Sequence, residues 1–176
     1  MKKKLFSLAV IIICLSITSM GTYAYFTAEK TAHNIITTGN IDIELAERTA
    51  GFTITGVMPG TELNEEIKVV NTGANAAWVR VKLDKSITLA QAGTPDMSLI
   101  QIHCDSADWV QQGEYYYYTH QLQPGTTTAV LNTQIAFDKT MGNLYQNSTA
   151  KIDICVQATQ VANNGTTVLE AQGWPE

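Results

Sequence analysis

Histidine, cysteine and basic residues are scarce in this chain of 176 residues, and each shortage excludes a class of function. The chain has three histidines and three cysteines, and its 11 lysines and arginines are outnumbered by 16 acidic residues. No basic stripe or arginine cluster is present, which argues against nucleic-acid binding and against a surface that attracts anionic membranes. Long amphipathic helical patterns are also missing, so a parallel α/β fold with crossover helices is not expected.

The residues that catalysis would need are equally sparse. His33, His103 and His120 are far apart, and no His-Glu-x-x-His motif places two of them on one helical face. A Gly-x-Ser-x-Gly motif is absent, and the neighbours His103 and Cys104 should point to opposite faces of a strand. We therefore predict that the protein is not an enzyme and that it has no metal site and no cofactor.

The N-terminus has the layout of a secretory signal. Lys2–Lys4 precede an apolar run from Leu5 to Ile17, which is short of the ~20 residues that a membrane helix needs. Small residues follow, and we predict cleavage between Ala24 and Tyr25. The membrane would then be contacted only through the uncleaved signal. Loss of the three lysines leaves eight basic and 16 acidic residues, a formal charge of −8.

The rest of the sequence alternates apolar and polar residues in short runs that glycine, proline and asparagine separate. In the run Trp78–Leu83, Val79 and Val81 should face one side of a strand, while Arg80 and Lys82 face the other. About eight to ten such runs, with turns every 8–12 residues, are typical of an all-β fold. We predict an antiparallel two-sheet sandwich, jelly-roll-like, with few short helical turns.

This pattern divides the chain into four segments. They are a signal peptide (1–24), an N-terminal leader (25–40), a β-sandwich domain (41–162) and a C-terminal tail (163–176).

Two cysteines remain after the predicted cleavage, Cys104 and Cys155. In an oxidising exterior they could form one disulfide. Both also lie in predicted strands, where buried thiols are common. The sequence leaves both alternatives open.

A run of four tyrosines, Tyr115–Tyr118, has two interpretations. In a strand, two of the rings would face the core and two would face outward, where together with Trp109 they could stack on sugars. The same run also has high β-propensity and would pack well on a sheet face. A carbohydrate-binding or surface-binding module that stays monomeric is therefore an alternative function.

Several blocks of the sequence match those of a known family. Ala24 is followed by Tyr25-Phe26-Thr27 and then by Thr38-Gly39-Asn40-Ile41, and the stretch Val70-Asn71-Thr72-Gly73 precedes Trp78-Val79-Arg80-Val81. In these blocks the chain resembles the TasA/camelysin (CalY) family of exported Gram-positive proteins, which a SipW-type signal peptidase cuts.

The resemblance implies a function in the biofilm matrix or on the cell surface. Members of this family form fibres in which the N-terminal strand of one subunit completes a sheet of the next. The expected partners are copies of the chain itself in a head-to-tail homopolymer, a SipW-like signal peptidase and related matrix proteins. The expected donor-strand residues are Tyr25, Phe26, Ala28, Ala32, Ile35 and Ile36.

Alternatives to this assignment remain. The leader could instead be a floppy tail, or an edge strand of its own domain. Camelysin has also been classed as a metallopeptidase, although the scattered histidines do not form the ligand pattern of such an enzyme.

Overall fold

The computed structural model describes residues 35–37, 41–46 and 51–175. The chain divides into two compact units, residues 1–32 and 33–176, and all the described residues belong to the second. The predicted signal peptide, its cleavage site at Ala24 and the leader up to residue 34 lie outside the described residues.

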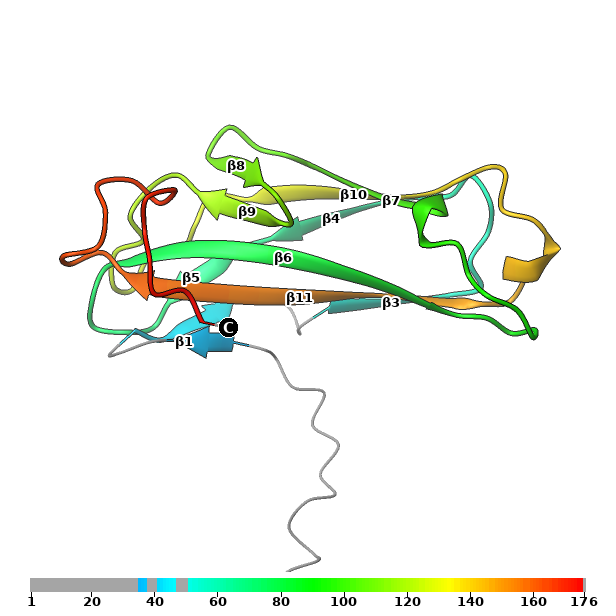
Figure 1. Ribbon diagram of the computed structural model, residues 1–176, viewed down its shortest axis with the longest axis horizontal. Coiled ribbons are helices and arrows are strands. Elements are labelled where there is room, and N and C mark those ends of the chain that lie inside the picture. Colours follow the sequence, from blue (N-terminus) through cyan, green and yellow to red (C-terminus); the bar gives the residue numbers. More distant parts are fainter. Residues whose placement is uncertain (1–34, 38–40, 47–50, 176) are drawn as a thin grey trace, which may run out of the picture. The chain divides into compact units, whose positions relative to one another are not determined.

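The described residues form eleven strands and two single-turn 3₁₀ helices (Figure 1). In chain order they are β1 (Ile35–Thr37), β2 (Ile43–Leu45), β3 (Gly51–Thr55), β4 (Glu62–Ile67), β5 (Val69–Asn71), β6 (Ala77–Thr88), η1 (Met97–Leu99), β7 (Ile100–Asp105), β8 (Trp109–Gln112), β9 (Tyr115–Tyr118), β10 (Leu131–Phe137), η2 (Asn143–Tyr145) and β11 (Thr149–Gln160). The predicted all-β sandwich is confirmed.

One layer is a six-stranded sheet in the order β1-β11-β6-β9-β8, with β3 also paired to β11. Its two longest strands, β6 and β11, pair antiparallel over all twelve residues. The other layer consists of a three-stranded sheet, β4-β10-β7, and a two-stranded sheet, β2-β5. The sequence suggested two antiparallel sheets, whereas the second layer is split and β1 pairs parallel with β11.

The second layer splits because β4 and β5 are almost one strand, interrupted at Lys68. Beyond this break β5 pairs with β2, and its other backbone groups reach the segment before β10. The Val69 carbonyl accepts a hydrogen bond from the Thr128 N–H, and the Asn71 N–H donates to the Thr126 carbonyl. The interruption lets one run of sequence contribute to both sheets of the layer.

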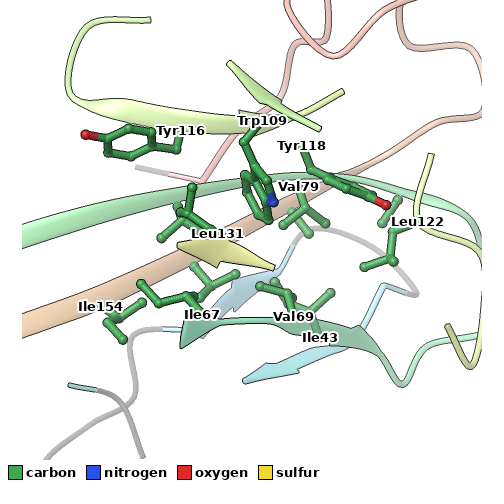
Figure 2. Close-up of a cluster of buried hydrophobic side chains, with 14 of the residues drawn as sticks. Ile43, Ile67, Val69, Val79, Trp109, Tyr116, Tyr118, Leu122, Leu131 and Ile154 are labelled. Carbon is green, nitrogen blue, oxygen red and sulfur yellow. The ribbon is translucent and has the colours of Figure 1, made fainter. Parts of the chain in front are cut away.

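The core lies between the two layers and follows the predicted alternation. Figure 2 shows Val79 and Ile154 of the six-stranded sheet opposite Ile67, Val69 and Leu131 of the other layer. On β11 the even-numbered side chains from Ala150 to Ala158 are buried in this way. The odd-numbered side chains of β11 therefore lie on the outer face of the six-stranded sheet.

Two tight turns lie at Pro-Gly pairs, Pro59-Gly60 and Pro124-Gly125. Gly60 and Gly125 have φ of 77° and 71°, a conformation that costs glycine little because it has no Cβ. The Gly60 N–H donates to the Phe137 carbonyl, and the Gly125 N–H donates to the Asn71 carbonyl. Each turn thus closes against the second layer.

Candidate functional site: the outer edge of β11

The edge of β11 that faces away from β6 is shared by two short strands. β1 pairs parallel with it from Val156 to Ala158, and β3 pairs antiparallel with it from Asp153 to Thr149. We call the stretch along Ile154–Gln160 of this edge, where β1 pairs, the lane. Ile35 and Ile36, two of the predicted donor-strand residues, lie in the lane within β1, whereas Tyr25, Phe26, Ala28 and Ala32 lie outside the described residues.

The backbone groups that the lane offers follow from strand alternation. The Val161 N–H donates to the Ala76 carbonyl on the β6 side, so odd-numbered residues of β11 bond toward β6. The N–H and C=O groups of Val156 and Ala158 therefore face the lane. A strand placed there satisfies groups that an edge would otherwise leave to water or to another chain.

β3 limits the length of the lane. Its first residue, Gly51, lies opposite Asp153, so only Ile154 and Cys155 separate the two strands along β11. Gly51 is itself packed tightly, since a Cβ there would collide with the backbone carbonyl of Ile152. The lane can therefore hold the last residues of the leader but not all of 25–36 in one continuous strand.

The outer face of the lane is covered by the C-terminal segment 161–175, which we call the C-terminal clip. Gln157 and Thr159 point outward from β11 and yet are only 4% and 3% exposed. Trp78 on the neighbouring strand is 2% exposed and packs with Val168 of the clip. The predicted C-terminal tail is thus folded onto the sheet.

Polar contacts hold the clip in place. The Trp78 indole N–H donates to the Asn164 carbonyl at 3.0 Å. The Asn164 amide donates to the carbonyls of Gln160 and Gln172 at 2.9 Å each, and its oxygen accepts from the Gln172 N–H at 2.7 Å. The Thr159 hydroxyl also donates to the Gln172 carbonyl, at 3.0 Å.

A cation and three aromatic rings join the clip to the sheet. The Arg80 guanidinium lies 3.9 Å from the Tyr115 ring centre and 4.5 Å from that of Trp174. It donates from Nε to Gln157 at 2.7 Å and from Nη1 to the Tyr117 hydroxyl at 3.2 Å. Tyr117 meets Trp174 edge to face. The outward tyrosines, Tyr115 and Tyr117, therefore already contact Arg80 and Trp174 within the molecule.

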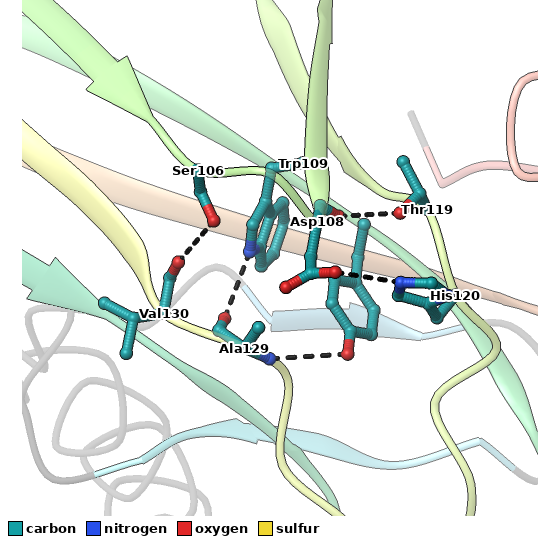
Figure 3. Close-up of polar contacts among 8 residues, drawn as sticks. Ser106, Asp108, Trp109, Thr119, His120, Ala129 and Val130 are labelled. Atoms are coloured by element: carbon teal, nitrogen blue, oxygen red, sulfur yellow. Dashed lines mark hydrogen bonds and ion pairs between the residues drawn. The ribbon is translucent and has the colours of Figure 1, made fainter.

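The predicted sugar platform is partly wrong. Tyr115 and Tyr117 do face outward, but Trp109 is buried in the core, 8% exposed, with Tyr116 and Tyr118. Its indole N–H donates to the Ala129 carbonyl (Figure 3). The polar end of Trp109 is satisfied inside the sandwich, so the ring can be buried at little cost.

The disulfide alternative is also wrong: Cys104 and Cys155 are not bonded to each other. Cys104 on β7 packs against the core and lies 3.5 Å from the Thr133 hydroxyl, whereas Cys155 is an odd-numbered, outward residue of β11. A disulfide needs Cα atoms within about 7 Å and Cβ atoms that point together, and a whole sheet separates these two thiols. Burial raises the pKa of both.

The described histidines do not approach each other. His103 lies on β7, and His120 follows β9 and bonds to the Asp108 carboxylate at 2.9 Å (Figure 3). Among the residues that the structure describes, no group of three or more histidine, cysteine, aspartate or glutamate side chains could hold a metal ion. His33 is outside the described residues.

A second sheet edge is open on β6. Ala77 exchanges both of its hydrogen bonds with Leu122, so odd-numbered residues of β6 bond away from β11. β9 pairs with this edge of β6 only from Arg80 to Lys82. Beyond Lys82, none of the described strands pairs with this edge. A groove of about 380 Å³ beside this edge is lined by Leu83 and Ile102, among others.

None of the helices in the described part of the chain is long and apolar enough to cross a membrane.

Sequence reasoning singled out Ile35 and Ile36, whose role as donor residues stays a prediction, and it missed the lane and the clip. Nothing in the sequence indicated that Gln157 and Thr159 are buried, because both are polar residues of a strand that alternates as expected. Trp174 near the C-terminus was the one available hint, because an isolated tryptophan in a polar segment needs a surface to pack on.

Comparison with known proteins identifies a family. The sequence model of the camelysin metallo-endopeptidase family matches residues 1–98, more than half of the chain. No curated protein and no solved structure matches the chain. The chain therefore belongs to the camelysin family, in agreement with the resemblance to TasA and camelysin that its motifs indicated.

Proposed function

We propose that this member of the camelysin family is a secreted, non-enzymatic structural protein of the cell surface or biofilm matrix, whose copies join by exchanging the leader strand. In this proposal a SipW-like peptidase cuts between Ala24 and Tyr25. The freed leader of one copy then enters the lane on β11 of the next copy. Related matrix proteins could take part through the same edge.

The pairing of β1 with β11 is the observation that carries this proposal. β1 pairs over only three residues, at a sheet edge, through a connection of a few residues to β2. An identical segment of another copy would make the same pairs at the same edge, so an exchange costs few contacts. Since the donor and the acceptor are different surfaces of each copy, the contacts are heterologous, and a filament grows when the rotation between copies does not close a ring.

The pairing within one chain is also what the alternative interpretation predicts, namely an edge strand of its own domain. The two differ in whether the strand can come from another copy. A mixing experiment separates them. One preparation of residues 25–176 carries Ile36→Cys and the other carries Gln157→Cys, both with Cys155→Ser because Cys155 lies two residues from Gln157 on the same face.

Strand exchange predicts disulfides between the two preparations, because Ile36 and Gln157 are register partners and neighbouring strands lie about 4.8 Å apart. Filaments are followed by electron microscopy, and a preparation that lacks residues 25–38, and with them β1, is the control that should form none. If mixed samples never form disulfides between copies, even where filaments are present, the proposal fails.

The family name suggests a second candidate, a metallopeptidase. A casein assay with and without a chelator tests it. Proteolysis that the chelator abolishes, and that purification does not remove, would contradict the non-enzymatic proposal.

A further inference from the structure

The lane on β11 is covered on its outer face as well as at its edge. Its inward residues, Val156 and Ala158, belong to the core, which is expected of a sheet. Its outward residues, Gln157 and Thr159, are almost completely buried. Thr159 bonds to Gln172 of the clip, and Gln157 bonds to Arg80, which stacks on Trp174 of the clip. The β3 half of the same strand has no such cover, and Lys151 and Asp153 there form a solvent-exposed ion pair.

The clip contacts the lane at the residues that pair with β1 or lie next to them. Thr159, next to Ala158, bonds to Gln172 and to Asn164. Gln157, the register partner of Ile36, bonds to Arg80, on which Trp174 stacks. A continuous series of contacts therefore runs from Trp174 through Arg80 and Gln157 to the backbone position of Ile36.

We propose that the C-terminal clip controls how fast a leader strand enters and leaves the lane on β11; this inference rests on the proposed strand exchange. A strand can leave only when the hydrogen bonds of Val156 and Ala158 open. The clip holds β11 directly at Thr159 and, through Arg80, at Gln157, and both of these side chains are shielded from water. Opening of the lane therefore requires the clip to loosen.

The clip acts on rate and leaves the preference between strands unchanged. It contacts β11 and β6, which belong to the accepting copy whether β1 comes from the same chain or from another. The clip therefore stabilises a bound β1 strand equally, whether the strand comes from the same chain or from another. A loosened clip should speed the exchange of strands and leave the final proportion of exchanged copies as it was.

Trp174→Ala tests this proposal, because it removes the stacking on Arg80 and the contact with Tyr117 while the polar contacts of Asn164 remain. Leu169→Ala is the matched control, since Leu169 lies in the same segment and is 48% exposed. Hydrogen exchange is measured on the monomer at low concentration. The amides of Val156 and Ala158 should exchange about tenfold faster in Trp174→Ala, as expected for loss of a cation–π contact and an aromatic pair.

The amides of β10 provide an internal reference, since β10 lies in the other layer. They should be unchanged if the variant is folded and the effect is local. Asn164→Ala is a second variant that loosens the clip by other contacts, and it should act in the same direction. Equal exchange at Val156 and Ala158 in the original chain, Trp174→Ala and Asn164→Ala would overturn the proposal.

The mixing experiment gives the second readout, with Trp174→Ala added to both preparations. Here one preparation carries Ile35→Cys and the other Val156→Cys, which are also register partners, so that Gln157 keeps its bond to Arg80. Disulfides between copies should form about tenfold faster and reach the same final yield, because the same contacts are lost. If disulfides form at equal rates with and without Trp174→Ala, the clip does not set the rate of exchange, and the proposal of strand exchange still stands. If they form in neither case, strand exchange itself is refuted.

Discussion

The two halves of the outer edge of β11 are covered in different ways. β3 pairs antiparallel over five residues, and two of them, Phe52 and Ile54, pack against the core. β1 pairs parallel over three residues, and its half of β11 is covered on the outer face by the clip. The β3 half is thus held by interior packing of β3 side chains, whereas the β1 half of β11 is covered by a segment from the far end of the chain.

In the proposed exchange β1 is replaced by the same segment of another copy, whereas β3 stays in place. Removing β3 would expose apolar surface of the core, which costs about 25 cal/mol for each Å² exposed to water. Replacing β1 by the same segment of another copy exposes nothing, because the clip and the lane stay with the acceptor. Substitutions in the β3 half and a change of pH at the clip test this contrast.

The largest effect is expected for Ile152→Ala in the β3 half. Ile152 is fully buried and is the register partner of Phe52, so the substitution leaves a cavity and should lower the free energy of unfolding by about 2–5 kcal/mol. Lys151→Ala is the control, because its exposed ion pair with Asp153 should contribute below about 1 kcal/mol. Urea unfolding measures the free energy of unfolding of both variants. Equal losses in Ile152→Ala and Lys151→Ala would contradict an edge held by interior packing.

Gly51→Ala should have an intermediate effect, about 1–3 kcal/mol. The added Cβ would collide with the Ile152 carbonyl and force the start of β3 away from β11. Hydrogen exchange should then show faster exchange in β3, with β4 unchanged. Gly142→Ala is the matched control, since a Cβ there meets no atom within 4 Å. If the amides of β3 remain protected in Gly51→Ala, close packing at Gly51 does not fix the boundary between the two halves.

The smallest effect concerns pH and the clip. Hydrogen bonds from the Thr166 hydroxyl and N–H hold the pKa of the Glu170 carboxyl below its ordinary value of 4.5. A lowered folded pKa means that the stabilisation is complete above pH 4.5 and is lost as the pH falls through the folded value. The Thr166 amide should therefore exchange faster in acid than its intrinsic rate predicts. Glu170→Gln should remove this dependence, and its persistence would assign the effect to another group.

Part of this architecture could be read from the sequence. Alternation predicted that Val79 and Val81 of β6 share one face of a strand, and glycine, proline and asparagine marked the breaks between the strands. These features are local, since a strand has a period of two and a turn needs particular φ values. The burial of Trp109 was not predictable, because either face of a short hairpin could have met the core.

The all-β sandwich and the camelysin family were evident from the amino-acid sequence, because periodicity, turn residues and motifs are local properties. What lies along β11 depends on tertiary contacts. Which strands share its edge, how far β3 limits the lane, and that residues 161–175 cover Gln157 and Thr159 all depend on contacts between distant parts of the chain. Polar residues in an alternating strand carry no sign that another segment will cover them.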